Sequence, residues 1–254
     1  MKNLTFHTKF LTMIFIHFFI MMYSMITDWS WSMLLIGLII AKIFNAVGNE
    51  AGLHRLWCHK SYETTLWKEY ILHAFSIPLM YGSAITYSGI HRQHHAYADT
   101  EKDPHVTRPW WKVMFFIKNE RYEIETKFVK DLIRQPLHKW VHLNYFKINV
   151  AILVAFLIVA GPYYTGWLLS YMVVHNFIGA GLVNIFGHRP EYGTRTFETN
   201  DQSSNNTFLK WFTWNEGYHN HHHAHPGDYS YVVHKGEFDF PAILIEKFFI
   251  DKSK

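Results

Sequence analysis

Four long apolar segments constrain this chain of 254 residues more than any other feature. They cover residues 10–27, 31–50, 148–161 and 166–187, and Lys42 is the single charged side chain in their apolar cores. A helix needs about 20 mostly apolar residues to cross a bilayer core of ~30 Å. Two segments have that length and the other two reach it with their flanks. Short linkers join them in pairs, so they predict two transmembrane helical hairpins.

The placement of basic residues predicts the orientation of these helices. Of the 24 Lys and Arg residues, fourteen lie in 54–147 and seven in 189–254, and neither hairpin linker contains any. Cytoplasmic segments carry the excess of Lys and Arg in membrane proteins. We therefore expect both termini and the central segment in the cytoplasm. A soluble helical protein with buried helices is the alternative, and the uncharged linkers argue against it.

The remaining residues predict a cap over the helices instead of a second domain. Residues 66–90 are apolar but contain Lys68, Glu69 and Pro78, so we expect a helix in the membrane interface and not a fifth span. The sequence Thr27-Asp28-Trp29 is no small-residue cleavage site, so the first segment is expected to stay uncleaved. The predicted fold is all-α: one domain over 1–254, with four transmembrane helices and a cytoplasmic cap of 54–147 and 189–254.

Nineteen histidines are the second unusual feature, and nine of them follow a pattern. The trios His91, His94, His95 and His219, His222, His223 have the spacing i, i+3, i+4, which places three side chains on one helical face. Asn184 and His188 are one turn apart. His54 and His59 are five apart and would not share an α-helical face. We expect that pair to bridge the end of a helix or to serve two different ions.

All these residues fall at predicted cytoplasmic ends, so nine imidazoles and one amide can converge beside the membrane. Nine is too many for one metal ion and suits two, and imidazole is a ligand for Fe, Cu, Zn or Ni. Each ligand His needs a partner on its other ring nitrogen. The nearby candidates are Glu50, Asp99, Asp103, Glu216 and Asp228. Structural or supporting roles are expected for His7, His17, His73, His105, His138, His142, His175, His221, His225 and His234.

The same motifs carry a family resemblance. They read HRLWCH at 54–59, HRQHH at 91–95, NIFGH at 184–188 and NEGYHNHHH at 215–223. From about residue 36 to 238 the chain resembles the membrane-bound fatty acid desaturases, in the branch of acyl-CoA and acyl-lipid Δ9 desaturases. The resemblance implies two non-haem iron ions held by those nine His, with Asn184 reaching one of them through a water. It implies no catalytic side chain beyond the metal ligands.

The implied reaction is the O2-dependent introduction of a cis double bond, at Δ9, into a saturated fatty acyl chain. Breaking an unactivated C–H bond is beyond side-chain acid–base chemistry, so a cofactor has to supply it. Electrons would come from a separate donor such as ferredoxin or cytochrome b5, and no nucleic acid is expected as a partner. The alternatives are a hydroxylase or other oxygenase on the same scaffold, or a metal-binding transporter, which would need ionisable residues along its spans.

Two details bear on the substrate. Gly89 and Ile90 stand where animal acyl-CoA enzymes carry charged residues, which favours a lipid-linked or carrier-linked acyl chain over CoA. Lys42 lies three turns before His54, ~18 Å along a helix. It would limit the depth of an acyl tunnel if it pointed inward. We expect instead that it extends toward the membrane surface or pairs with a lipid headgroup.

Overall fold

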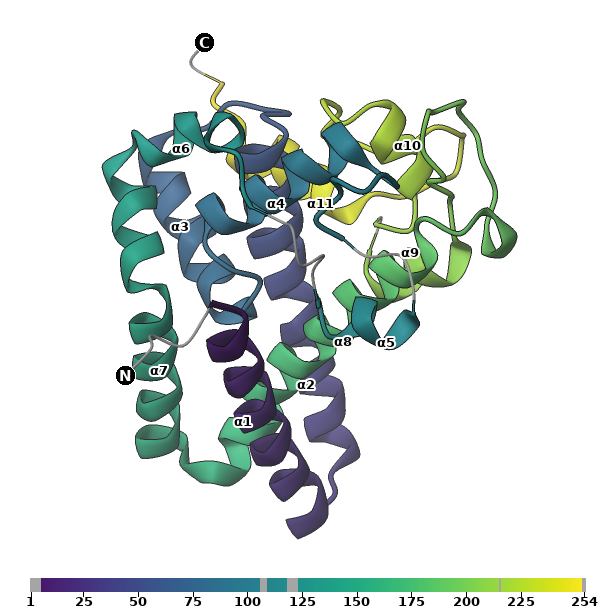
Figure 1. Ribbon diagram of the computed structural model, residues 1–254. Coiled ribbons are helices and arrows are strands. Elements are labelled where there is room, and N and C mark those ends of the chain that lie inside the picture. Colours follow the sequence, from purple (N-terminus) through teal and green to yellow (C-terminus); the bar gives the residue numbers. More distant parts are fainter. Residues whose placement is uncertain (1–5, 106–108, 118–122, 215, 253–254) are drawn as a thin grey trace.

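The computed structural model describes residues 6–105, 109–117, 123–214 and 216–252. Helices dominate these residues, and their one extended pairing is an isolated bridge between Thr194 and Asn205. Long helices form a bundle, and short helices gather at one end of it (Figure 1). The predicted all-helical class is confirmed for the described part of the chain.

The first two long helices are longer than the sequence predicted. Helix α1 spans Phe6–Thr27, and α2 spans Trp31–Phe44 and continues without a break as the π-helix η1, Asn45–Cys58. The helix thus continues past residue 50, where the apolar segment ends, because the charged residues in this part are paired. Buried Arg55 contacts Glu50 at 3.2 Å and Asp239 at 3.1 Å, so these charges do not require solvent.

The third long helix contains both remaining apolar segments. It consists of α7 (Pro136–Thr165), the π-helix η4 (Gly166–Ser170) and α8 (Tyr171–Phe186). Gly161 interrupts it with φ 72° directly before Pro162, and the chain reverses there and returns toward the cap (Figure 1). Three helices, 6–27, 31–58 and 136–186, are therefore long and apolar enough to cross a membrane.

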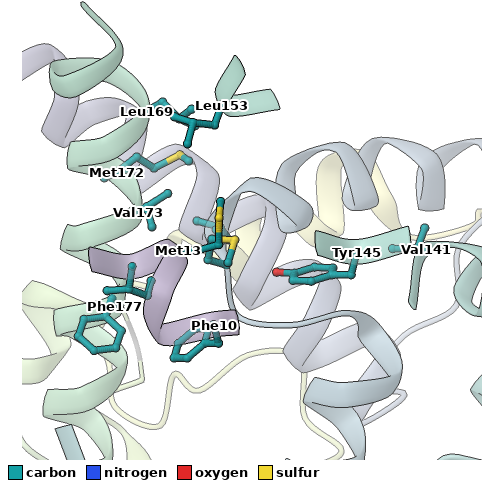
Figure 2. Close-up of a cluster of buried hydrophobic side chains, with 13 residues drawn as sticks. Phe10, Met13, Val141, Tyr145, Leu153, Leu169, Met172, Val173 and Phe177 are labelled. Carbon is teal, nitrogen blue, oxygen red and sulfur yellow. The ribbon is translucent and has the colours of Figure 1, made fainter. Parts of the chain in front are cut away.

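The bundle core is made by side chains of α1, α2, α7, η4 and α8 (Figure 2). Phe10, Tyr145 and Phe177 are among its buried members. Polar contacts fix the helices as well: His17 Nδ1 lies 3.0 Å from Ser170 Oγ, which gives His17 the structural role expected of it. The outer surface is also apolar, with Ile158 78% and Val159 86% exposed. Such a surface needs apolar surroundings, which identifies a membrane protein.

Residues 66–90 do not form the single interfacial helix that the sequence predicted. The chain forms α3 (Leu66–Ser76) and the 3-10 turn η2 (Ile77–Leu79), and then turns into α4 (Ala84–Tyr97). The break follows Pro78, and Met80 and Gly82 adopt left-handed conformations with φ 62° and 97°. Helix α4 can therefore enter the cap at a new angle.

Short helices and turns complete the cap, which lies at the η1 end of the bundle (Figure 1). They are α5 (Trp110–Met114), η3 (Thr126–Phe128), α6 (Lys130–Ile133), η5 (Pro190–Tyr192), α9 (Thr207–Phe212), α10 (His219–Ala224), α11 (Phe240–Leu244) and η6 (Ile245–Phe249).

Candidate metal centre

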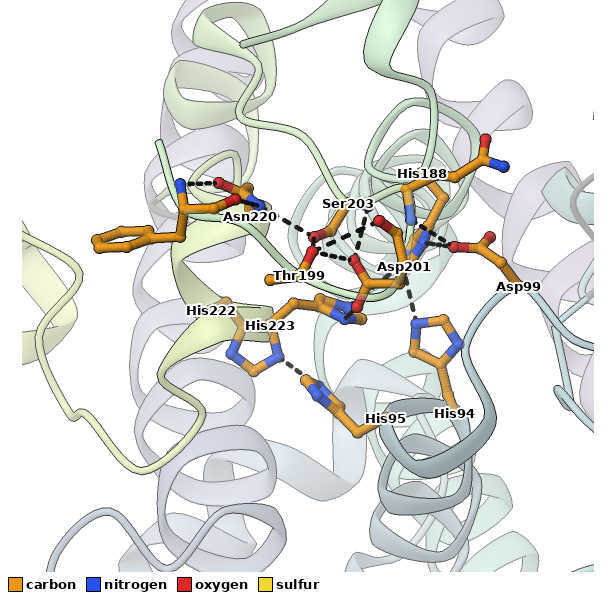
Figure 3. A network of polar contacts seen from close by, with 12 residues as sticks. His94, His95, Asp99, His188, Thr199, Asp201, Ser203, Asn220, His222 and His223 are labelled. Carbon is orange, nitrogen blue, oxygen red and sulfur yellow. Dashed lines mark hydrogen bonds and ion pairs between the residues drawn. The ribbon is translucent and has the colours of Figure 1, made fainter. Parts of the chain in front are cut away.

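Four elements bring the nine predicted histidines together: the end of η1, α4, the turn after α8, and α10. Figure 3 shows how His94, His95, His188, His222 and His223 lie toward one another. They form two groups of four, in each of which the possible ligand atoms lie within 4.8 Å of one another. The first group is His54, His59, His91 and His222, and the second is His94, His188, His219 and His223. His95 lies beside His222 and His223. The predicted convergence of nine imidazoles is present in the structure.

The π-helix explains how His54 and His59 join one group. Hydrogen bonds in a π-helix run from residue i to i+5, so residues five apart lie close to one another on the helix. The His59 amide donates to the His54 carbonyl at 3.0 Å, and the two ring centroids are 4.9 Å apart. The expectation that the two would lie on different faces assumed α-helical winding. His59 is the C-cap of η1, so the pair bridges the end of a helix, which was the first of the two alternatives, and both rings join one group.

The inward-facing Nε2 atoms have the spacing of a metal coordination shell. In the first group the separations are 3.1 Å for His54–His91, 3.2 Å for His54–His222 and 3.1 Å for His91–His222. In the second group His94 and His188 are 3.0 Å apart. Metal–nitrogen bonds of ~2.1 Å place neighbouring nitrogens of a six-coordinate shell ~3.0 Å apart. The donor atoms therefore fit bound metal ions.

The opposite ring nitrogens face oxygen atoms that fix the tautomer. The Nδ1 contacts are His54–Glu216 at 3.1 Å, His94–Asp103 at 2.9 Å, His188–Asp99 at 2.9 Å, His223–Asp201 at 2.8 Å and His222–Tyr231 at 3.1 Å. A carboxylate accepts a hydrogen bond from Nδ1–H, which keeps the proton on Nδ1 and leaves the Nε2 lone pair directed at the cluster. Unprotonated nitrogens ~3 Å apart repel, and a shared cation removes that repulsion.

Burial keeps these imidazoles in the form that binds metal. The pKa values of His91, His219 and His222 lie well below the ordinary value, first because the rings are buried and then because neighbouring imidazoles disfavour a second charge. Neutral histidine is the ligand form. Among the described residues, His59 Nε2 and both ring nitrogens of His219 are buried without a hydrogen-bond partner. A metal ion would satisfy His59 Nε2 and one ring nitrogen of His219.

The supporting carboxylates were predicted only in part. Asp99, Asp103 and Glu216 contact cluster histidines as expected, but Asp228 lies 3.5 Å from His221, which is outside the cluster. Glu50 pairs with Arg55, and its carboxylate also lies within 4.8 Å of the ligand atoms of His54 and Glu216.

Sequence reasoning missed Asp201 and Tyr231, which hold His223 and His222. Asp201 precedes its partner by 22 residues along the chain, so no local spacing indicated it.

Most of the other histidines have structural contacts. His73 and His138 lie 3.0 Å apart, His142 contacts Ser83 at 2.8 Å, and His7 contacts the Phe115 carbonyl at 3.1 Å. The His175 ring stacks on Tyr171, the His225 ring packs edge-on against Phe197, and the His105 ring lies 5.0 Å from that of His94. These contacts stabilise the packing of the cap and the bundle around the cluster.

A cavity of about 150 Å³ connects the histidine cluster to the bundle core. Its polar end is lined by His91, His94, His219, Glu216 and Asn184. Its apolar lining includes Phe6, Phe10, Ile14, Phe116 and Phe177. A mostly apolar cavity with a few converging polar groups is typical of a site for an apolar ligand. Asn184 lines the polar end of this cavity beside the histidines.

Lys42 does not follow either expectation from the sequence. It is not among the residues that line the cavity. Its ammonium hydrogen-bonds to the backbone carbonyls of Trp211 and Phe212, at the end of α9. The apolar surroundings explain this contact, because the carbonyls that end a helix are ready partners for a cation.

Comparison with known proteins agrees with this geometry. The family description "Fatty acid desaturase" matches residues 29–235. An sn-1 stearoyl-lipid 9-desaturase of Anabaena variabilis is 28% identical over 202 residues, covering 78% of this chain and 74% of the relative. An sn-2 palmitoyl-lipid 9-desaturase of Nostoc sp. (strain 36) is 29% identical over 216 residues, covering 80% and 74%. A probable acyl-CoA desaturase of Schizosaccharomyces pombe is 30% identical over 227 residues, covering 83% and 46%.

The fold and the histidine cluster define a membrane enzyme with a candidate metal site at the end of an apolar cavity. The chain belongs to the fatty acid desaturase family. It is therefore an oxidoreductase that acts on fatty acyl chains.

Proposed function

We propose that this enzyme introduces a cis double bond at Δ9 into a saturated fatty acyl chain, using O2 and electrons from an external donor at a centre of two iron ions. One observation carries the proposal: two groups of four histidines lie at one end of an apolar cavity. Family membership favours iron over the other metals that imidazole binds.

In this proposal each histidine group holds one iron. His95 completes the first group, since its Nε2 lies 2.7 Å from that of His222. Asn184 supports the second iron through a water. The nine ligands are His54, His59, His91, His94, His95, His188, His219, His222 and His223.

The chain's own residues position the substrate and the ligands. The bound irons, with O2, would supply the removal of two hydrogens from neighbouring methylenes. The cavity places the acyl chain beside the histidines, and its aromatic walls exclude water. Asp99, Asp103, Asp201 and Glu216 keep the imidazoles oriented.

The proposed membrane arrangement has four spans, because Gly161 divides the third long helix in two. We place the cap and both termini on the cytoplasmic side, where the basic residues gather. That side also suits an acidic electron donor such as ferredoxin or cytochrome b5.

A glycerolipid is the proposed carrier of the acyl chain. Two of the relatives above are named as lipid desaturases. The position of Gly89 supports this view, because a Cβ there would lie 2.8 Å from both Ile124 and Val129. A charged side chain for binding CoA has no room at this position.

Expression in a host that lacks desaturases tests the proposal. Mass spectrometry of fatty acid methyl esters should show a new monounsaturated chain, and separation of lipid classes should show it in glycerolipids first. Hydroxylated chains in its place would indicate the oxygenase alternative. Saturated chains alone, with folded iron-loaded protein and a working electron donor, would refute the proposal.

A further inference from the structure

We propose that Lys42 is a positioning residue that fixes one wall of the acyl cavity and thereby helps to select which methylene lies against the metal centre. The inference rests on the proposed function. It starts from a charged side chain inside an apolar helix that neither lines the cavity nor belongs to the histidine cluster.

Through both its side chain and its backbone, Lys42 ties α2 to residues 211–214, which are the end of α9 and the turn that follows it. Its ammonium binds the carbonyls of Trp211, at 3.1 Å, and Phe212. The rings of Phe212 and Trp214 lie over the same ammonium at 5.7 and 5.3 Å. In return, Trp214 Nε1 donates to the Lys42 carbonyl at 2.9 Å. The contact thus joins two elements that are far apart in sequence.

The surroundings of Lys42 make this contact strong. Its side chain is half-buried, and its ammonium lies against the rings of Phe212 and Trp214. An ammonium without a polar partner in such apolar surroundings is costly. The carbonyls that end α9 have no partner within that helix, so they are ready acceptors.

Residues 211–214, which Lys42 contacts, continue into part of the cavity wall. Thr213 directly follows Phe212, is 7% exposed and lines the cavity. Its hydroxyl donates to the Leu209 carbonyl at 2.9 Å, and its methyl packs against Gly179, where a Cβ would approach within 3.1 Å. Three residues later, Glu216 lines the same cavity and supports His54. A shift of this segment therefore changes both the cavity and the orientation of a proposed ligand.

Selection of one methylene is sensitive to such a shift. Neighbouring methylenes of a saturated chain have nearly the same reactivity, so only the shape of the cavity distinguishes them. A looser wall lets the chain slide by one carbon without preventing the reaction.

Three variants test this inference in the full chain, expressed in the same host. Lys42→Met removes the charge at similar length, Lys42→Arg keeps a donor, and Lys139→Met is the matched control at an exposed position of α7. Lys42→Met should make roughly tenfold more product at neighbouring positions, equivalent to ~1.4 kcal/mol of lost discrimination, while it retains iron. Lys42→Arg should stay close to wild type, and Lys139→Met should match it.

A second variant and a hydrogen-exchange measurement, which does not require enzyme activity, complete the test. Trp214→Phe removes the N–H donor and shortens the ring but keeps an aromatic face near the ammonium, and it should cause a smaller shift in the same direction. In metal-free protein, the amides of residues 211–214 should exchange hydrogen faster in Lys42→Met than in Lys139→Met. Folded Lys42→Met and Trp214→Phe with wild-type isomer ratios and exchange rates would overturn the inference. An inactive wild-type enzyme would instead refute the proposed function. The exchange measurement would still test whether Lys42 holds residues 211–214 in place.

Discussion

In the histidine cluster, the hydrogen bonds of the Nδ1 atoms determine whether the Nε2 atoms can bind a metal ion. Asp99, Asp103 and Asp201 each accept a hydrogen bond from the Nδ1–H of one imidazole, and Glu216 lies 3.1 Å from His54 Nδ1, so the lone pairs of the opposite nitrogens converge. Such partners commonly account for 10–100-fold in metal affinity. The carboxylates are therefore as much a part of the candidate centre as the histidines.

Replacing Asp201 by Asn tests this at a single residue. The amide is a weaker acceptor for His223 Nδ1, so iron affinity, measured by competition with a chelator, should fall by roughly 10–100-fold. Asp228→Asn is the control, because Asp228 contacts His221 outside the cluster. Equal affinities of the two variants would show that Asp201 does not support a ligand.

At this scale the sequence predicted the imidazoles better than their partners. The i, i+3, i+4 spacing gives each trio on α4 and α10 a common face once those helices form. Asp103 lies near its partner in the sequence and could be predicted. Asp201, 22 residues before His223, reaches the cluster only through the folding of the cap, and no local pattern reports such a contact. Tyr231 is as near to His222 in the sequence as Asp103 is to His94, and only the folded structure shows that its hydroxyl reaches the ring.

Among the elements, η1 departs most from expectation. Its π-helical winding brings His54 and His59 together, and its buried charges allow the helix to extend to Cys58. Standard α-helical periodicity could not predict either feature. Two glycines of η1, Gly48 and Gly52, also let α3 approach its backbone closely.

A Gly48→Ala substitution tests the packing of η1 on α3. The new Cβ would lie 2.5 Å from the Phe75 carbonyl oxygen, and backbone cannot move aside as a flexible side chain can. We expect a loss of ~1–3 kcal/mol in stability, measured by thermal unfolding in detergent. Gly227→Ala is the control, since nothing lies within 4 Å of a Cβ there. Unchanged stability of Gly48→Ala would contradict the packing seen at this contact.

For the whole molecule, hydropathy predicted the long helices but not how two of them are joined. The linker 161–166 was expected to separate two helices, and it continues as helix after the kink at Gly161. The backbone conformation of Gly161 determines how the two helices are joined, and average hydropathy carries no information about that conformation. The predicted four spans thus depend on how this one helix lies in the bilayer.

Cysteine labelling tests the proposed orientation. The single native cysteine, Cys58, is buried and should not react. In sealed cells, an impermeant maleimide should label Ser32→Cys, next to the first hairpin linker, and not Lys235→Cys in the cap. Inside-out vesicles should give the reverse pattern. Labelling of both sites from the same side would contradict the proposed topology.

The metal content of the purified enzyme tests the central claim most directly. The two groups of four histidines predict two iron ions per chain, measured by elemental analysis of protein that supports desaturation in the same preparation. His94→Ala should insert into the membrane but lose iron from the second group together with activity. An active wild-type enzyme that holds one iron ion, or a His94→Ala variant with full iron and full activity, would contradict the account.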